Sequence, residues 1–407
     1  MGEFLFLAHR VPFPPDRGDK IRSHHLLKGL AKLGPVHAGT FAETPQDRAQ
    51  KGELAAIAKT HALIQRNKSL PLAGVEALIK RRPVSLTAFD HESMHRYVAK
   101  TLGNHKIDTV FVFSGQMGQY VPDDYAGRVI IDLCDVDSAK FEAYAAAGQR
   151  SWLNRREGRL LAREEERLAH RADRTLLISD NEVGLFRSRL SDTRQVALQA
   201  LGNGIDADFF DPSRVDLHPD LEECDNPQLV FTGQMDYAPN VAAAAWMIEN
   251  VMPALRRTYA RARFHIVGRA PTAALRDRHG ENGVRVWGEV PDVRPFLKSA
   301  DLVVAPLLIA RGVQNKVLEA MAMAKPVVVT PGAATGIDAD DGLHFAVAPP
   351  DPPQMIERME ALLRDRDKRL EMGRAARQFV IDRMSWDSIH KQLAQVIAPQ
   401  DSANHAV

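Results

Sequence analysis

Short apolar runs, each followed by an amphipathic segment with helical spacing, recur along the whole chain. Many of these runs are rich in Val, Ile and Phe and stop at Gly or Pro. Buried strands of parallel sheets have this composition because helices cover both faces of the sheet. The pattern predicts an α/β protein. The expected strands are 4–8, 36–40, 109–113, 129–133, 175–178, 229–233, 263–268, 284–288, 301–306 and 325–330.

The chain has 407 residues, which is too long for one ordinary core and suits two domains. We expect two Rossmann-like, doubly wound domains that face one another across a cleft, with ligands at the carboxyl ends of the strands. The first would span residues 1–200, completed by a C-terminal helix at 376–397, and the second residues 201–375. The expected helices are 21–33, 51–66, 92–102, 152–171, 353–373 and 385–397.

Composition excludes several classes of function. Lys and Arg number 53 against 52 Asp and Glu, so no basic excess points to a nucleic-acid partner. The two cysteines have no metal-ligand spacing, which fits a reducing cytoplasm. No P-loop, H-E-x-x-H or G-x-S-x-G motif occurs, which argues against P-loop NTPases, zinc hydrolases and α/β-hydrolases.

We expect neither a signal peptide nor a membrane span, because no apolar run approaches the ~18 residues that a span needs. A peripheral contact with a membrane stays open. Residues 152–171 form a helical segment dense in Arg and Glu. It can be a basic face for anionic lipid or a solvated helix, and its balanced charges favour the solvated helix.

Residues 301–330 carry the most informative pattern, in which a strand, a loop, a helix and a strand follow one another. Gly312 allows close backbone approach, and Asn315 is placed to cap the helix, whose free N–H groups suit a phosphate. Lys316 can reach a pyrophosphate, and Glu319 can accept both hydroxyls of a ribose. A glutamate near a helix start is also favoured by the helix dipole, but the combination favours nucleotide binding.

Two loops of the first half also follow strands. In the first, Gly18 allows a phosphate or acceptor to approach, with Arg17 or Lys20 assisting, although an ordinary surface turn is the alternative. In the second, Asp135 or Asp137 can orient or deprotonate an acceptor hydroxyl, assisted by Ser138, and helix capping is an equal alternative.

The segment LEAMAMAKPVVVT resembles the nucleotide-sugar segment of the GT-B retaining glycosyltransferases of family 4, whose pattern is E-x7-E followed by A-M-A-x-G-x-P-V-V. The second Glu of that pattern falls on Glu319, whereas Arg311 stands at the first and Ala324 at the usual Gly. The closest resemblance is to sugar transferases associated with PEP-CTERM/exosortase exopolysaccharide systems. It is carried by PFPPDRGDKIRSHHLL, DLCDVDSAKF, FTGQMDYAPNV, IVGRAP and RGVQNKVLEAMA, which extend over residues 12–322.

The resemblance implies a GT-B fold and a role for each matching residue. Glu319 would hold the donor ribose and Lys316 the diphosphate, and backbone groups of the turn from Gly288 to Val290 would flank the base. The family's usual Arg after the first strand of the second domain is replaced by Gln234, so Arg269 and Lys316 are the expected substitutes. The full expected donor-binding set is Gly18, Gly233, Arg269, Val290, Arg311, Gly312, Val313, Asn315, Lys316 and Glu319, and the expected catalytic set is Asp135, Asp137 and Lys316.

The resemblance further implies retaining transfer of a hexose from a UDP- or GDP-linked donor to a saccharide or lipid-linked acceptor, in exopolysaccharide or cell-surface glycan synthesis. The enzyme would be cytoplasmic, with a peripheral contact at the inner membrane face. Asp135 and Asp137 also spell the metal-binding D-x-D of the GT-A fold, but the paired Rossmann pattern opposes that fold, so we expect no essential metal and no cofactor. A nucleotide-sugar epimerase or hydrolase and a non-catalytic nucleotide-sugar-binding protein are the alternatives.

Overall fold

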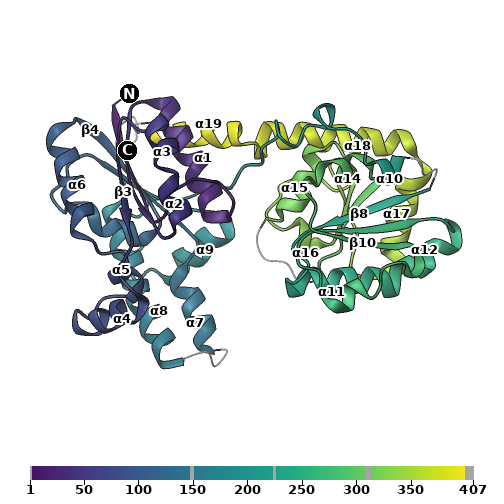
Figure 1. Ribbon diagram of the computed structural model, residues 1–407, viewed down its shortest axis with the longest axis horizontal. Helices are drawn as coiled ribbons and strands as arrows, with labels where there is room; N and C mark the ends of the chain where they lie inside the picture. Colours follow the sequence, from purple (N-terminus) through teal and green to yellow (C-terminus); the bar gives the residue numbers. More distant parts are fainter. Residues whose placement is uncertain (1, 147–150, 223–225, 309–312, 399–407) are drawn as a thin grey trace, which may run out of the picture. The chain divides into compact units, whose positions relative to one another are not determined.

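The computed structural model describes residues 2–146, 151–222, 226–308 and 313–398. The chain divides into two compact units, one of residues 1–203 with 389–407 and the other of residues 204–388 (Figure 1). Residues 376–388, which we expected to complete the first domain, are grouped with the second unit. The predicted cleft between two facing domains stays a prediction, and each unit is described by itself.

The first unit contains a seven-stranded parallel sheet in the order β3-β2-β1-β4-β5-β6-β7. The order reverses between β1 and β4, as in a doubly wound sheet with helices on both faces. Its strands are β1 (Glu3–Ala8), β2 (Val36–Ala42), β3 (Thr60–Gln65), β4 (Ile107–Phe113), β5 (Arg128–Cys134), β6 (Arg174–Leu177) and β7 (Leu198–Ala200). Its helices are α1 (Gly18–Leu33), α2 (Pro45–Ala49), α3 (Lys51–Ile57), α4 (Leu70–Ile79), α5 (Val84–Ala88), α6 (Glu92–Asn104), α7 (Asp137–Ala146), α8 (Ser151–Arg171) and α9 (Asp180–Arg189).

The second unit contains a six-stranded parallel sheet in the order β10-β9-β8-β11-β12-β13, which reverses between β8 and β11. Its strands are β8 (Gln228–Thr232), β9 (Arg263–Val267), β10 (Val284–Gly288), β11 (Leu302–Ala305), β12 (Val327–Val329) and β13 (Ala346–Val347). Its helices are α10 (Pro219–Glu222), α11 (Ala238–Trp246), α12 (Met252–Thr258), α13 (Ala273–Arg276), α14 (Arg294–Ser299), α15 (Asn315–Ala322), α16 (Pro331–Ala334), α17 (Pro352–Arg364) and α18 (Arg366–Phe379). The last helix, α19 (Trp386–Ile397), begins in this unit and ends in the first.

Three expectations about secondary structure were wrong. The helix expected at 51–66 ends at Ile57, and residues 60–65 form β3, which pairs with β2 along its whole length. The helix expected at 353–373 is two helices, because the Asp365 carboxylate accepts a hydrogen bond from the N–H of Lys368 and starts a second one. The helix expected from residue 21 begins one turn earlier, at Gly18.

An ion pair between α1 and β5 lies in the core of the first unit. Arg22 is 1% exposed, and its Nε donates to Asp132 Oδ2 at 2.8 Å. Its Nη1 donates to the carbonyl of Gly202 and to Asn203 Oδ1. Because a buried charge without its partner is costly, this pair fixes α1 against the carboxyl end of β5.

Helix α15 ends in a residue with a left-handed backbone. Ala324 has φ +54°, and the N–H of the next residue, Lys325, bonds the carbonyl of Ala320, as in a helix C-cap. Glycine adopts this conformation without steric cost, whereas alanine pays for its Cβ. This explains why Gly is common at this position in the pattern that the sequence resembles.

We predict that Ala324→Gly raises the free energy of unfolding by about 0.5–1 kcal/mol, because it removes the left-handed strain. Urea denaturation followed by circular dichroism measures the change. Ala322→Gly is the matched control, since Ala322 is the last residue of α15 and has helical geometry. There the same substitution should cost about 1 kcal/mol or more. A loss of stability in Ala324→Gly would contradict the prediction.

Candidate functional site

The second unit has a pocket at the carboxyl ends of β8, β9 and β10, beside the first turn of α15. Its volume is about 510 Å³. In a doubly wound sheet this edge, near the point where the strand order reverses, is where ligands bind. The pocket is lined by Thr232, Gly233, Gln234, Tyr237, Asn240, Val267, Gly268, Arg269, Glu289, Val290, Val293, Val313, Gln314, Asn315, Lys316 and Glu319.

Two glycines shape the floor of this pocket. Gly233 follows β8 with φ +155°, and Gly268 follows β9 with φ +150°. A Cβ on Gly268 would lie 1.7 Å from the carbonyl oxygen of Gly233. The two strand ends therefore approach each other more closely than any side chain allows, and this leaves backbone exposed to a ligand.

Lys316 is held in place by a chain of hydrogen bonds. Its Nζ donates to Asn240 Oδ1 at 2.5 Å, and Asn240 Nδ2 donates in turn to the carbonyl of Gln234 at 2.9 Å. The ammonium also lies 5.0 Å from the centre of the Phe231 ring. A cation is thus fixed at the end of β8 before any ligand arrives.

Glu319 lies three residues after Lys316, on the same face of α15. No described residue donates a hydrogen bond to its carboxylate. Burial raises the pKa of Glu319 to about 7 although Lys316 opposes the shift. Burial likewise lowers the pKa of Lys316 to about 8, opposed by Glu319. The attraction between the two charges does not offset their loss of water, so both groups are ready to gain partners from a ligand.

Arg269 supplies a second cation at the mouth of the pocket. Its Nη2 donates to Gln234 Oε1 at 2.9 Å. Gln234 occupies the position where the resembled family has an Arg. Its amide oxygen therefore holds a guanidinium that comes from the neighbouring strand end.

The structure brings together most of the expected donor-binding residues of the second half. One pocket is lined by Gly233, Arg269, Val290, Val313, Asn315, Lys316 and Glu319. Asn315, however, does not cap the helix, because α15 already starts there and Gln314 is the N-cap residue. Arg311 and Gly312 lie outside the described residues.

The RGDK loop of the first unit leads into α1. Gly18 is exposed at the start of α1, with open space around its Cα. Lys20 is buried, and its Nζ donates to Asp47 Oδ1 at 2.7 Å. Arg17 pairs with Asp19 at 2.8 Å. The expectation that Arg17 or Lys20 assists a ligand at this loop stays a prediction, and the ion pair with Asp47 disfavours Lys20.

Asp135 and Asp137 follow β5 at the carboxyl edge of the first sheet. Asp135 is exposed, and Asp137 begins α7, where burial raises the pKa of its carboxyl group. Ser138 is buried, and its Oγ donates to Glu165 Oε2 at 2.6 Å. Ser138 thus joins α7 to α8, and its role toward an acceptor stays a prediction.

Sequence analysis gave no role to two residues that lie near the carboxyl edges of the two sheets. Asn240, which positions Lys316, was quoted only as part of a longer segment. Its signal is the Pro-Asn pair near the start of α11. His9 follows β1 and stacks on Phe113, with ring centres 5.8 Å apart. Its Nδ1 is buried and has no hydrogen-bond partner among the described residues. Its signal is its place directly after the first strand.

His265 of β9 is a buried histidine whose two ring nitrogens both have hydrogen-bond partners. It accepts a hydrogen bond from Trp287 Nε1 on Nδ1, so its Nε2 carries the proton and donates to Gln228 Oε1 at 2.7 Å. Burial lowers the pKa of His265 to about 3, and the ring therefore stays neutral.

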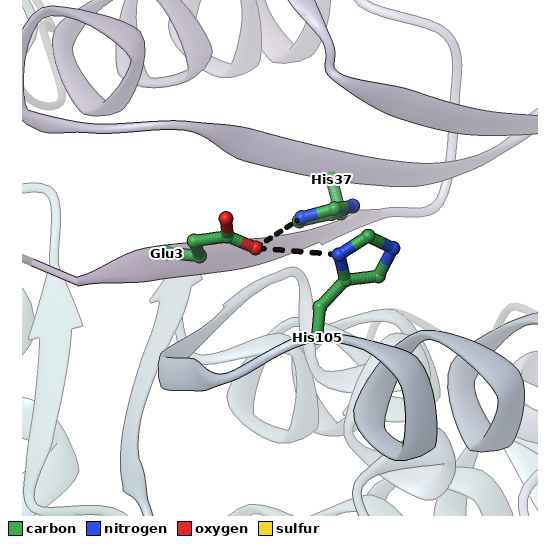
Figure 2. A group of neighbouring side chains, drawn as sticks. All are labelled: Glu3, His37 and His105. Atoms are coloured by element: carbon green, nitrogen blue, oxygen red, sulfur yellow. Dashed lines mark hydrogen bonds and ion pairs between the residues drawn. The ribbon is translucent and has the colours of Figure 1, made fainter.

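A group of potential metal ligands lies at the other edge of the first sheet. Figure 2 shows Glu3, His37 and His105, which gather where β1, β2 and β4 begin. Glu3 Oε2 lies 2.9 Å from His37 Nε2 and 3.5 Å from His105 Nδ1, while Lys59 pairs with the other carboxylate oxygen at 2.5 Å. The hydrogen bonds from Lys59 and His37 lower the pKa of Glu3 to about 2. The carboxylate is thus already neutralised, and this edge is not where ligands of such sheets bind.

Residues 226–365 match the family model described as Glycosyl transferases group 1. Three solved structures resemble the whole chain at low sequence identity. Sucrose-phosphate synthase from Thermosynechococcus elongatus has a TM-score of 0.64 and 15% identity, covering 97% of this chain and 98% of its own. HepE from Anabaena, in complex with UDP, has a TM-score of 0.63 and 16% identity, and the match covers 97% of this chain and 99% of HepE. WaaG, a glycosyltransferase involved in lipopolysaccharide biosynthesis, has a TM-score of 0.59 and 18% identity, and the match covers 98% of this chain and 100% of WaaG.

The fold is GT-B. Each unit is the doubly wound, Rossmann-like α/β domain of GT-B glycosyltransferases, and the sequence-based fold class is confirmed. No curated protein matches the chain. The pocket lies inside the matched region, because its lining residues run from Thr232 to Glu319.

We predict that Glu319→Gln stabilises the ligand-free protein at about pH 8 by roughly 1–3 kcal/mol. The raised pKa means that the folded state binds this proton more tightly than the unfolded state. The carboxyl group therefore loses its contribution to stability as pH rises from about 4.5 to about 7. Glutamine has no charge to desolvate, so its advantage over glutamate should vanish in acid.

Urea unfolding at several pH values measures this difference. Glu357→Gln, an exposed change on α17, is the control and should have no effect. Equal stability of Glu319→Gln and the native protein across the whole pH range would contradict the burial of a costly charge.

Proposed function

We propose that the protein is a retaining glycosyltransferase of the family 4 type. It transfers a hexose from a UDP- or GDP-linked donor to a saccharide or lipid-linked acceptor. The protein takes part in the synthesis of exopolysaccharide or cell-surface glycan, of the kind associated with PEP-CTERM/exosortase systems. It works in the cytoplasm, in peripheral contact with the inner membrane face, and needs no metal.

One observation carries the proposal. A fixed cation, Lys316, and a carboxylate to which no described residue donates a hydrogen bond, Glu319, line one pocket at the carboxyl edge of a doubly wound sheet. These two groups match the two polar parts of a nucleoside diphosphate. The ammonium suits the diphosphate, and the carboxylate can accept hydrogen bonds from both ribose hydroxyls. The UDP in the HepE complex supports the same ligand class.

The proposed reaction places negative charge on the leaving diphosphate. The acceptor oxygen forms a bond to the anomeric carbon on the side from which the diphosphate departs. The C–O bond to the diphosphate breaks, and the acceptor proton passes to a phosphate oxygen of the leaving group. Lys316 and Arg269 stabilise the developing charge, since cations fixed in advance need no reorganisation. Asp135 and Asp137 are proposed to orient the acceptor hydroxyl for this step.

A non-catalytic nucleotide-sugar-binding protein is the second candidate, because Gln234 replaces the usual Arg. The hydrogen bond from Arg269 to Gln234 weakens this candidate, since it returns a guanidinium to the same place. An epimerase or hydrolase would turn over the donor without an acceptor. Product analysis with and without an acceptor separates the three functions.

We predict that Glu319→Ala and Lys316→Ala each weaken UDP binding by about tenfold or more while the fold persists, because each removes one polar partner of the nucleotide. A thermal-shift titration with UDP, GDP, ADP, TDP and CMP measures binding, as a ligand that binds only the folded state raises the melting temperature. EDTA should leave the shift unchanged.

The matched controls are Glu357→Ala and Lys368→Ala, which change exposed residues of α17 and α18 in the same unit. Both should bind UDP as the native protein does. A folded Glu319→Ala variant that binds UDP with native affinity would contradict the proposed binding site. A thermal shift that EDTA abolishes would contradict the proposal that binding needs no metal.

A further inference from the structure

Helix α4 of the first unit has its large apolar residues on the outside. Its buried positions are Ala73 and Ala77, one helical turn apart. Five large apolar side chains of the same helix are between 49% and 78% exposed: Leu70, Leu72, Val75, Leu78 and Ile79. A helix packed only through alanines, with leucines in water, has the inverse of the usual arrangement and marks a contact surface.

The one acidic residue of α4 is already neutralised. Glu76 pairs with Lys68 at 2.7 Å and with Lys80 at 2.6 Å. Residues 66–82 contain five cationic side chains and this single acidic one. Arg66 pairs with Glu43 and Arg82 with Asp90, so Arg81 is the cation of this segment that has no ion pair among the described residues.

Helix α8 lies beside α4 (Figure 1). Residues of α8, together with Leu78 and Arg81, line a pocket rich in arginine. Arg156 joins the two helices, because its Nη2 donates to the carbonyl of Ala77 at 2.7 Å. The pocket has a volume of about 280 Å³ and contains no acidic residue. It is lined by Leu78, Arg81, Trp152, Arg156, Arg159, Leu160 and Arg163.

The balanced charges of α8 are separated in the structure. Each glutamate is occupied: Glu157 by the N–H groups of Val84 and Ser85, Glu164 by Arg167, Glu165 by Ser138, and Glu166 by Ser191. In contrast, Arg81, Arg159 and Arg163 have no ion pair with any residue that the structure describes. Three of the four arginines in the pocket therefore keep their charge without an ion pair among the described residues, whereas Arg156 Nη1 lies 4.0 Å from Glu157 Oε2.

The Arg156 guanidinium also has an unused donor. Its Nη1 is buried and has no hydrogen-bond partner among the described residues. Trp152, 67% exposed, stands at the edge of the same pocket. A tryptophan beside arginines is the combination found where proteins meet the boundary between lipid head groups and acyl chains.

We infer that α4 and the arginine face of α8 form a docking surface for an anionic lipid membrane. The apolar residues of α4 enter the acyl boundary, and the arginines receive head-group phosphates in the pocket. A second copy of this chain fits less well, since two such surfaces would bring like charges together. The inference rests on the membrane contact of the proposed function and gives that contact its residues. No helix in the described part of the chain is long and apolar enough to span a bilayer, so docking would be peripheral.

Vesicle flotation tests the surface. The native protein should float with phosphatidylcholine vesicles that contain phosphatidylglycerol, should bind pure phosphatidylcholine at least about tenfold more weakly, and should lose binding at high salt. Arg159→Gln/Arg163→Gln and Leu72→Ser/Ile79→Ser should each weaken binding about tenfold. The controls are Arg366→Gln and Leu370→Ser, equally exposed changes on α18 of the other unit, and these should float as the native protein does.

Equal binding to both vesicle types, no binding, or native flotation of either variant would overturn the inference. A dimer in light scattering that the variants convert to monomers, without vesicle binding, would assign the surface to self-association and also overturn it. The UDP thermal shift of the same variants should equal that of the native protein. If the native protein itself shows no thermal shift with UDP, the proposed donor pocket is overturned, whereas the flotation result is unaffected.

Discussion

The pocket of the second unit depends on two charges kept from water at one end of α15. Lys316 and Glu319 attract each other too weakly to offset their burial, as the shifted pKa values of both groups indicate. The fold retains them because Asn240 fixes the ammonium and because Gly233 and Gly268 bring two strand ends together beneath it. A site that costs stability without a ligand is typical of a site built to bind one.

The electrostatics of the pocket agree with the proposed chemistry. A leaving diphosphate gains negative charge, and the pocket offers Lys316 and Arg269 before that charge appears. We propose that Arg269 compensates for Gln234, which stands where the resembled pattern has an Arg. The cation moves to the neighbouring strand, and the glutamine oxygen holds it. The function of such a residue is apparent only when both strand ends are seen together.

Local patterns predicted the two parallel sheets and the residues around Lys316, because apolar runs that end in Gly or Pro follow from the chain itself. The strand β3 was missed because its residues are only partly buried, and the two-residue β13 is too short for any pattern. Long-range partners were also beyond sequence reasoning. Lys20 is buried by Asp47, and the glutamates of α8 are occupied by Ser138, Ser191 and the backbone of α5. Net charge along the sequence does not show which charges of α8 are paired.

In the proposed function, Glu319 holds the ribose of the donor nucleotide. The most direct test is a calorimetric titration of the native protein and of Glu319→Ala, each with UDP and with 2′,3′-dideoxy-UDP. The native protein should prefer UDP by about tenfold or more, because the dideoxy compound leaves a buried carboxylate without donors, and Glu319→Ala should bind both compounds equally. The same preference for UDP in both proteins would show that another group reads the ribose and would contradict the account.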